Sequence, residues 1–183
     1  MRLQSVAYNK FLILFIYLFA IALQAQSKLF QQGEIPRDSI LKVAQIIIDS
    51  AKCKVLVTVD ENGIPHAREM APFPIEKDMK IWFGTFATSR KVKQILGNPS
   101  VAVFYYDANS QSYVSINGIA RLVNDKEKKD KYWIEGWKVF YPDKDKEYIL
   151  IEVTPDRLEV CSFKYKLFWD ESGKPLSIDF NEQ

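Results

Sequence analysis

The chain has 183 residues, a length that suits one domain of ordinary size. Its composition, 48% hydrophobic and 14% aromatic, is enough to build a hydrophobic core. Basic and acidic residues number 25 and 23, and two of the basic ones lie in the first 25 positions, so the remainder is balanced at 23 each. This balance argues against a nucleic-acid-binding protein, which needs a basic surplus on one face.

Residues 1–25 have the pattern of a secretory signal peptide. Arg2 and Lys10 precede an apolar run over 11–23, and Ala25 offers a small residue for cleavage. As a helix this run would span roughly 20 Å, short of the ~30 Å of a bilayer core. We therefore expect a cleaved signal, export to the periplasm or the extracellular space, and no membrane association after cleavage. An uncleaved N-terminal anchor is the alternative.

The mature chain is expected to begin with a loose segment over 26–37, followed by a helix whose apolar residues recur every three to four positions up to Ser50. Alternating valines predict a strand over 53–60. Asn62-Gly63 predicts a hairpin turn, because this pair readily takes positive φ, and the returning strand covers 66–71.

A third strand is predicted over 79–85 and a short helix over 91–96, which Gly97-Asn98-Pro99 ends. Two further strands follow over 101–106 and 113–123. Gly118 inside the second of them indicates a bulge or a close backbone approach.

The last third of the chain predicts a helix over 125–139, which is rich in lysine and then in aromatic residues. Two strands, 148–154 and 157–163, flank a turn at Pro155-Asp156, and residues 171–183 read as a C-terminal tail. Strands in mostly hairpin order predict a mainly β domain with flanking helices over 38–170. The expected architecture is a six- to seven-stranded antiparallel split or closed β-barrel.

The residues that commonly carry chemistry are few. Cys53 and Cys161 lie in strand-like segments, and they could form a disulfide in an exported protein or be two small buried side chains. His66 is the only histidine, which excludes a histidine-built zinc site and disfavours a Ser-His-Asp triad. The usual glycine-rich nucleotide motifs are absent. Any chemistry is therefore expected to come from a cofactor.

The turn after the third strand collects groups that bind anions. Thr85, Ser89, Arg90 and Lys91 lie near one helix N-terminus, where free backbone N–H groups and the helix dipole favour negative charge. Hydroxyls and cations add donors, and a phosphate fits this set. The alternative is an ordinary serine N-cap with solvated basic residues, although cations at a helix N-terminus oppose the dipole.

Arg68 and Met70 share one face of the second strand, two residues apart. We expect the third strand to run beside it and to bring Phe83 and Thr85 to the same place. These four side chains could line a flat, partly polar ligand whose phosphate lies at residues 89–91. Flavin mononucleotide (FMN) has this shape.

The order of these motifs resembles a known family, the pyridoxamine 5′-phosphate oxidase-like FMN-binding split barrels, and within it the general stress protein 26 branch. The resemblance covers about residues 38–170 and rests on the segments 66–70, 81–85, 89–95, 98–104 and 113–120. It implies a homodimer with two FMN sites at the subunit interface. It also implies that FMN is contacted by Arg68, Met70, Phe83, Thr85, Ser89, Arg90 and Lys91, of which Arg90 and Lys91 hold the phosphate.

Two features differ from the true oxidases of that family. Tyr113 stands where they often have a glutamine, and their substrate-binding Arg-x-His is missing, since residues 163–183 contain neither Arg nor His. We therefore expect an FMN-dependent oxidoreductase with an unidentified small-molecule redox partner, and not an enzyme that forms pyridoxal phosphate. The alternatives are a non-catalytic binder of flavin, heme or deazaflavin, and a split-barrel relative that has lost its ligand.

Overall fold

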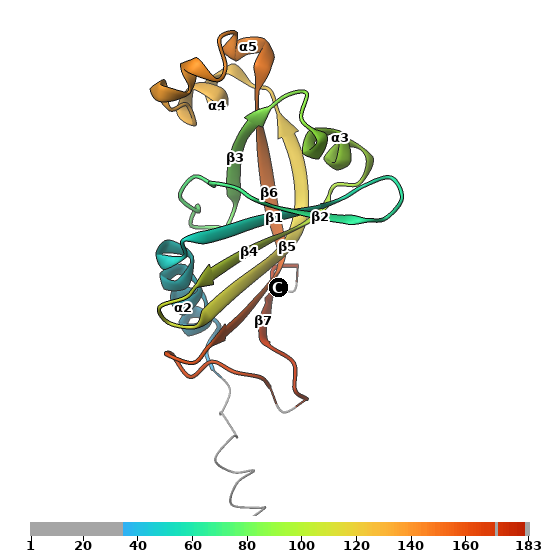
Figure 1. Ribbon diagram of the computed structural model, residues 1–183. Helices are drawn as coiled ribbons and strands as arrows, with labels where there is room; N and C mark the ends of the chain where they lie inside the picture. The colour runs from blue at the N-terminus through green and yellow to red at the C-terminus, as the bar shows by residue number, and fades with distance from the viewer. Residues whose placement is uncertain (1–34, 171, 182–183) are drawn as a thin grey trace, which may run out of the picture. The chain divides into compact units, whose positions relative to one another are not determined.

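Seven strands form one antiparallel sheet in residues 35–170 and 172–181, the part of the chain that this computed structural model describes (Figure 1). The order along the sheet is β2-β1-β4-β5-β6-β3, and β7 pairs with β6. The predicted antiparallel, mainly β architecture is confirmed. The strands are β1 (Cys53–Val59), β2 (Pro65–Glu69), β3 (Ile81–Phe86), β4 (Ser100–Asp107), β5 (Ser112–Val123), β6 (Tyr148–Ser162) and β7 (Leu176–Asp179).

The helices are short apart from the first. They are α2 (Arg37–Ser50), α3 (Arg90–Gly97), α4 (Lys126–Lys131), the 3-10 helix η1 (Glu135–Val139) and α5 (Lys144–Glu147). Helix α2 packs on β4 and β5 through side chains that recur every three to four residues, namely Ile40, Ala44, Ile47 and Ile48. None of the described helices has the length and apolar content needed to cross a membrane. The predicted signal segment lies outside the described residues.

The long strands β5 and β6 join two parts of the sheet. Residues 112–119 of β5 pair with β4, whereas residues 148–153 of β6 pair with β3. Between these parts the register of β5 against β6 shifts at Asn117 and Gly118. A Cβ atom on Gly118 would lie 2.2 Å from the carbonyl oxygen of Thr154, so only glycine fits there. The bulge or close approach predicted from Gly118 is confirmed.

The predicted turn at Pro155-Asp156 is wrong, because β6 runs through it without a break. Gly118 pairs with Pro155 and Asn117 pairs with Arg157, so Asp156 is the extra residue of a bulge. A bulge tolerates proline because the missing N–H is not needed by the ladder. Strand β7, which lies in the predicted tail, was not anticipated.

The predicted helix over 125–139 is also wrong, since it is divided into α4 and η1. The hydroxyl of Tyr148 donates to the carbonyl oxygen of Tyr132 at 2.6 Å, at the end of α4. Tyr132, Trp133 and Trp137 all pack near the Tyr148 ring instead of continuing one helix. Aromatic packing therefore overrides the local helical pattern.

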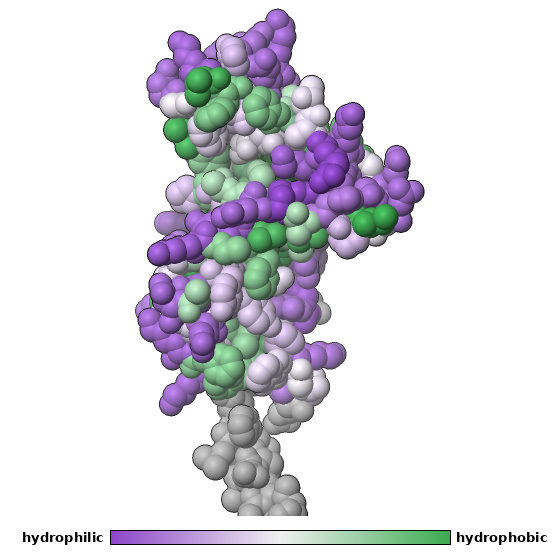
Figure 2. All heavy atoms as spheres, in the orientation of Figure 1, coloured by the Kyte–Doolittle hydropathy of each residue, from purple (hydrophilic) through white to green (hydrophobic). Residues whose placement is uncertain are grey.

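One side of the sheet forms the core, where Leu56, Val103, Ile116 and Leu158 are fully buried. The opposite side of β1, β4 and β5 carries many apolar residues that are half-buried or exposed, together with Ser115 and Asn117, and we call it the outer face. Figure 2 shows hydrophobic residues reaching the surface over the sheet, among hydrophilic ones. The apolar residues of the outer face are Val55, Val57, Val59, Ala102, Phe104, Tyr106, Tyr113 and Ile119.

The two cysteines lie in one row across the sheet, in which Cys53 pairs with Tyr106, Tyr106 with Tyr113, and Tyr113 with Cys161. Three strand spacings of about 4.8 Å separate them, far beyond the ~7 Å that a disulfide tolerates. Both thiols are free, Cys53 exposed and Cys161 buried. The disulfide that the sequence left open is therefore excluded within one chain, and the reading of Cys53 as a buried side chain is wrong.

Candidate functional site

The segment between β3 and α3 places four of the predicted site residues close together. Thr85 is near the end of β3, Ser89 occupies the N-cap of α3, and Arg90 and Lys91 begin the helix. The Nζ atom of Lys91 donates a hydrogen bond to the hydroxyl of Thr85 at 3.0 Å. Helix α3 is thereby tied to the end of β3.

Ser89 does not behave as an ordinary N-cap. Its side chain makes no capping hydrogen bond, and its buried Oγ atom has no hydrogen-bond partner among the described residues. A buried polar group without a partner costs about 1–3 kcal/mol. An oxygen of a bound anion next to the first turn of α3 would satisfy it, which the alternative of a plain serine cap does not explain.

Arg68 reaches the same region from β2. Along this strand His66, Arg68 and Met70 are half-buried, whereas the residues between them are exposed. The Nη1 atom of Arg68 donates to the hydroxyl of Thr58 at 2.7 Å and to the carbonyl oxygen of Leu56 at 3.1 Å. Its guanidinium group is therefore fixed against β1.

The prediction that the third strand runs beside the second is wrong. Strand β3 pairs with β6 and β2 pairs with β1, so they stand at opposite ends of the strand order. Helix α3, which packs on β1 (Figure 1), connects the two ends. Its Gln94 accepts a hydrogen bond from Arg68 at 3.2 Å, and its Lys91 donates to Thr85.

Arg68, Arg90 and Lys91 form a group that we call the cation cluster. None of them takes part in an ion pair with a carboxylate of the described residues. Burial lowers the pKa of Lys91, and the charges of Arg68 and Arg90 lower it further. Burial and then the charge of Arg90 likewise lower the pKa of Arg68. The cluster is positive without compensation, which favours a bound anion.

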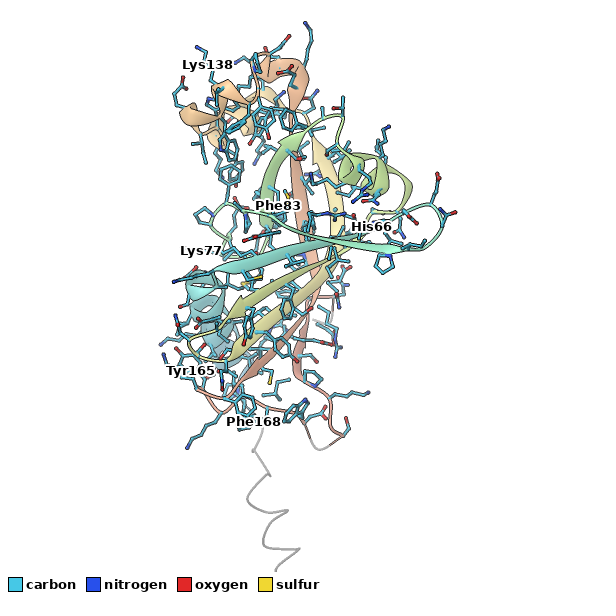
Figure 3. The ribbon with its side chains drawn as sticks, in the orientation of Figure 1. His66, Lys77, Phe83, Lys138, Tyr165 and Phe168 are labelled. Atoms are coloured by element: carbon cyan, nitrogen blue, oxygen red, sulfur yellow. The ribbon has the colours of Figure 1, made fainter. Side chains whose placement is uncertain are left out.

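Two predicted site residues lie apart from the cation cluster. Phe83 is fully buried within the core (Figure 3), so its ring is not presented to a ligand at the surface. Met70 lines a shallow pocket together with Lys52, Lys54, Glu69 and Ala71. The structure therefore groups Arg68, Thr85, Ser89, Arg90 and Lys91.

A second pocket adjoins the cluster at the β1–β2 hairpin, and its lining includes Asp60, His66, Arg90 and Lys93. The Nε2 atom of His66 lies 2.8 Å from a carboxylate oxygen of Asp60. This hydrogen bond lowers the pKa of Asp60. The only histidine is thus engaged by a carboxylate on its own hairpin.

Sequence reasoning missed two buried polar residues at the site, Thr58 and Gln94. Thr58 shares the inward face of β1 with Leu56, and Gln94 stands between the buried Val92 and Ile95 on α3. On α3 the available signal was a polar residue within an apolar stripe, whereas on β1 the alternation of Lys54, Leu56 and Thr58 gave none.

Comparison with known proteins places this arrangement in context. The family model described as pyridoxamine 5′-phosphate oxidase-like matches residues 38–178. General stress protein 26 of Bacillus subtilis (strain 168) is 30% identical over 122 residues, which cover 63% of this chain and 84% of that protein.

Solved structures show the same fold. A protein from Clostridium acetobutylicum, described as related to general stress protein 26, superposes with a TM-score of 0.65 at 20% identity and covers 80% of this chain and 99% of its own. An FMN-binding, pyridoxamine 5′-phosphate oxidase-related protein from Nostoc punctiforme gives a TM-score of 0.56 at 16% identity, with coverages of 81% and 98%. The predicted split-barrel fold is confirmed.

Proposed function

Because the chain belongs to the pyridoxamine 5′-phosphate oxidase-like family, we propose that it binds FMN and that the cation cluster holds the FMN phosphate. The observation that carries this proposal is the buried hydroxyl of Ser89, which has no partner among the described residues and lies next to three cations that lack carboxylate partners in the same part of the chain. A phosphate supplies both the acceptor oxygens and the negative charge that this arrangement needs.

The roles of the residues follow from their positions. Arg90 and Lys91 contact the phosphate from the first turn of α3, and Arg68 approaches it from β2. Ser89 would donate a hydrogen bond from its hydroxyl to a phosphate oxygen, and Thr85 orients Lys91 through their 3.0 Å hydrogen bond. Bound FMN would supply hydride or electron transfer with a small-molecule partner, so the protein would be an oxidoreductase. The C-terminal residues 163–183, without Arg or His, support a substrate other than that of the true oxidases.

The binding experiment uses the purified protein, incubated with excess FMN and then desalted. A visible flavin absorbance of about one per chain is expected, and the double variant Arg90→Ala/Lys91→Ala is expected to lose it. A colourless wild-type protein whose addition leaves FMN fluorescence unchanged would contradict the proposal. Catalysis is tested next, by reduction of the bound flavin with a nicotinamide donor and reoxidation at a catalytic rate.

We also propose that the protein is a homodimer in which the outer face is covered by a second copy, with FMN at the interface. Antiparallel sheets with one solvated face usually carry polar residues on it. Here Phe104 and Tyr113 stack on the outer face with ring centroids 5.5 Å apart, and Ile119 is 44% exposed. Light scattering is expected to give a dimer that Phe104→Lys dissociates. Val139→Lys, at an exposed apolar residue of η1, is the matched control and should leave the dimer intact.

Export is a further proposal, which rests on the sequence of residues 1–25 alone. The expected outcome is a secreted or periplasmic chain whose mass lacks these residues. Recovery of the whole chain in the cytoplasm would contradict it.

A further inference from the structure

Two polar residues are buried beside the cation cluster, and the roles assigned above do not use them. Thr58 is 0% exposed and Gln94 is 6% exposed. They come from different elements, β1 and α3, and their side chains meet directly. Buried polar groups of this kind are stable only when their hydrogen bonds are made, so the partners define what the residues do.

The hydrogen bonds of this pair converge on Arg68. The hydroxyl of Thr58 donates to Gln94 Oε1 at 2.6 Å, so its one proton is used and its lone pairs are free to accept. It accepts from Arg68 Nη1 at 2.7 Å, and Gln94 Oε1 accepts from Arg68 Nη2 at 3.2 Å. Two neighbouring nitrogens of one guanidinium are thus held by two side chains that are themselves joined.

All the acceptors that hold Arg68 within the described residues are neutral. The third is the carbonyl oxygen of Leu56, at 3.1 Å. Elsewhere in the described residues the guanidinium groups of Arg121 and Arg157 are held by carboxylates, the first by Glu152 and the second by Glu159 and Asp179. A carboxylate beside Arg68 would cancel most of the charge that it offers to an anion, whereas neutral oxygens fix its position and leave that charge in place.

We propose that Gln94 and Thr58 are positioning residues that hold Arg68 at the phosphate site without neutralising it. They thereby make the site selective for a phosphorylated flavin over the unphosphorylated one. This inference rests on the proposed FMN-binding function. A purely structural role, in which the pair only fastens α3 to β1, would affect both ligands and the stability of the protein alike.

The experiment compares the dissociation constants of FMN and riboflavin, measured by quenching of flavin fluorescence. Gln94→Glu keeps the side-chain shape and places a carboxylate against Arg68. FMN affinity is expected to fall at least about tenfold, while riboflavin affinity changes by less than about threefold. Thr58→Val, which keeps shape and removes the hydroxyl, is expected to weaken FMN binding in the same selective way. Thermal unfolding by circular dichroism verifies that each variant is folded.

The matched control is Lys77→Gln, at an exposed residue between β2 and β3. It changes the charge by the same one unit as Gln94→Glu but does not touch Arg68, so FMN affinity should change by less than about threefold.

Three results would overturn the inference. They are unchanged FMN affinity in Gln94→Glu and Thr58→Val, an equal loss of FMN and riboflavin affinity in both, or an equal loss of FMN affinity in Lys77→Gln. A wild-type protein that does not prefer FMN over riboflavin would instead contradict the proposed phosphate site itself, and the inference would fall with it.

Discussion

The ammonium group of Lys91 donates to the hydroxyl of Thr85 at 3.0 Å, so a cation with no carboxylate partner among the described residues ties helix α3 to the end of β3. Thr85→Val keeps the shape of this buried side chain and removes the acceptor. The freed ammonium is less well oriented, and FMN affinity is expected to fall about three- to tenfold in fluorescence titrations. Thr88→Val, at an exposed hydroxyl of the same turn, should have no effect.

Affinity and stability should respond in opposite directions when the cation cluster is dismantled. Burial lowers the pKa of Lys91, and the like charges of Arg68 and Arg90 lower it further, because three neighbouring cations repel one another. Arg90→Ala/Lys91→Met is expected to weaken FMN binding by about a hundredfold or more. Without ligand, its melting temperature at low salt should equal or exceed that of the wild type.

High salt should narrow the difference in melting temperature between the ligand-free double variant and the wild type, because screening weakens repulsion between exposed charges. Lys42→Ala/Lys77→Met, which removes two charges from exposed positions elsewhere, is the control and should bind FMN normally. A ligand-free double cluster variant that melts well below the wild type would show that the cluster serves stability instead of binding.

At the bulge between β5 and β6, we expect the single methyl group added by Gly118→Ala to destabilise the fold strongly. Gly118→Ala would place a Cβ atom 2.2 Å from the carbonyl oxygen of Thr154, and backbone cannot move aside as a side-chain tip can. A loss of about 2 kcal/mol or more in the free energy of unfolding is expected from urea denaturation. At Gly97 an added Cβ meets nothing within 4 Å, so Gly97→Ala should be neutral or slightly stabilising.

Acid sensitivity is predicted at Glu76. Its carboxylate accepts from the hydroxyl of Tyr132 at 2.7 Å and from Lys131 at 3.1 Å, and these hydrogen bonds, that of Tyr132 foremost, lower its pKa from 4.5 to about 2. Because the folded pKa lies below the unfolded one, the stabilisation is complete above pH 4.5 and is lost as the pH falls towards 2.

Glu76→Gln should therefore destabilise the protein at neutral pH and flatten the loss of stability between pH 4.5 and 2. Urea denaturation at several pH values measures both effects. Glu127→Gln, at an exposed glutamate of α4, is the control. If it flattened the dependence of the unfolding free energy on pH as much as Glu76→Gln does, the acid sensitivity would not come from Glu76.

The two thiols should differ in reactivity. Cys53 is exposed, whereas Cys161 is buried, and burial raises the pKa of its thiol. A thiol reagent is expected to modify Cys53 in the native protein and Cys161 only after unfolding. Unfolded, unreduced protein should show two free thiols per chain. An intrachain disulfide would lower the mass of the chain by about two daltons, for the two hydrogens lost. We expect no such decrease, because the sheet register keeps Cys53 and Cys161 three strands apart.

Features that are contiguous in sequence were predictable. The Asn62-Gly63 hairpin is present, with Gly63 at φ 78°, and the Ser89–Lys91 turn does begin a helix. The features that the sequence did not predict depend on residues that are distant along the chain. The break after α4 arises from the hydroxyl of Tyr148, and the continuity of β6 through Pro155 arises from its pairing with β5.

The candidate site shows the same division between features that are contiguous in sequence and features that depend on distant residues. The expectation that β3 runs beside the strand of Arg68 was wrong, because β3 pairs with β6 and Arg68 instead contacts α3 through Gln94. Thr58 and Gln94 escaped notice because their hydrogen-bond network joins three elements that only the folded chain assembles. A sequence pattern reports which residues share a face, and it does not report which faces meet.

The position of β3 in the sheet also orders the events of folding. Strands β4 and β5 pair as neighbours in the chain, and only short helices separate β5 from its partner β6. Strand β3 pairs with β6 as well, but the first residue of β6, Tyr148, lies far along the chain from Phe86. Long loops close late, since their entropy cost precedes the contacts that offset it. The proposed phosphate site needs both β3 and α3, so we expect it to be complete only after β6 has been made and has paired with β3. If FMN is the ligand, the compartment in which the chain completes its folding would have to supply it.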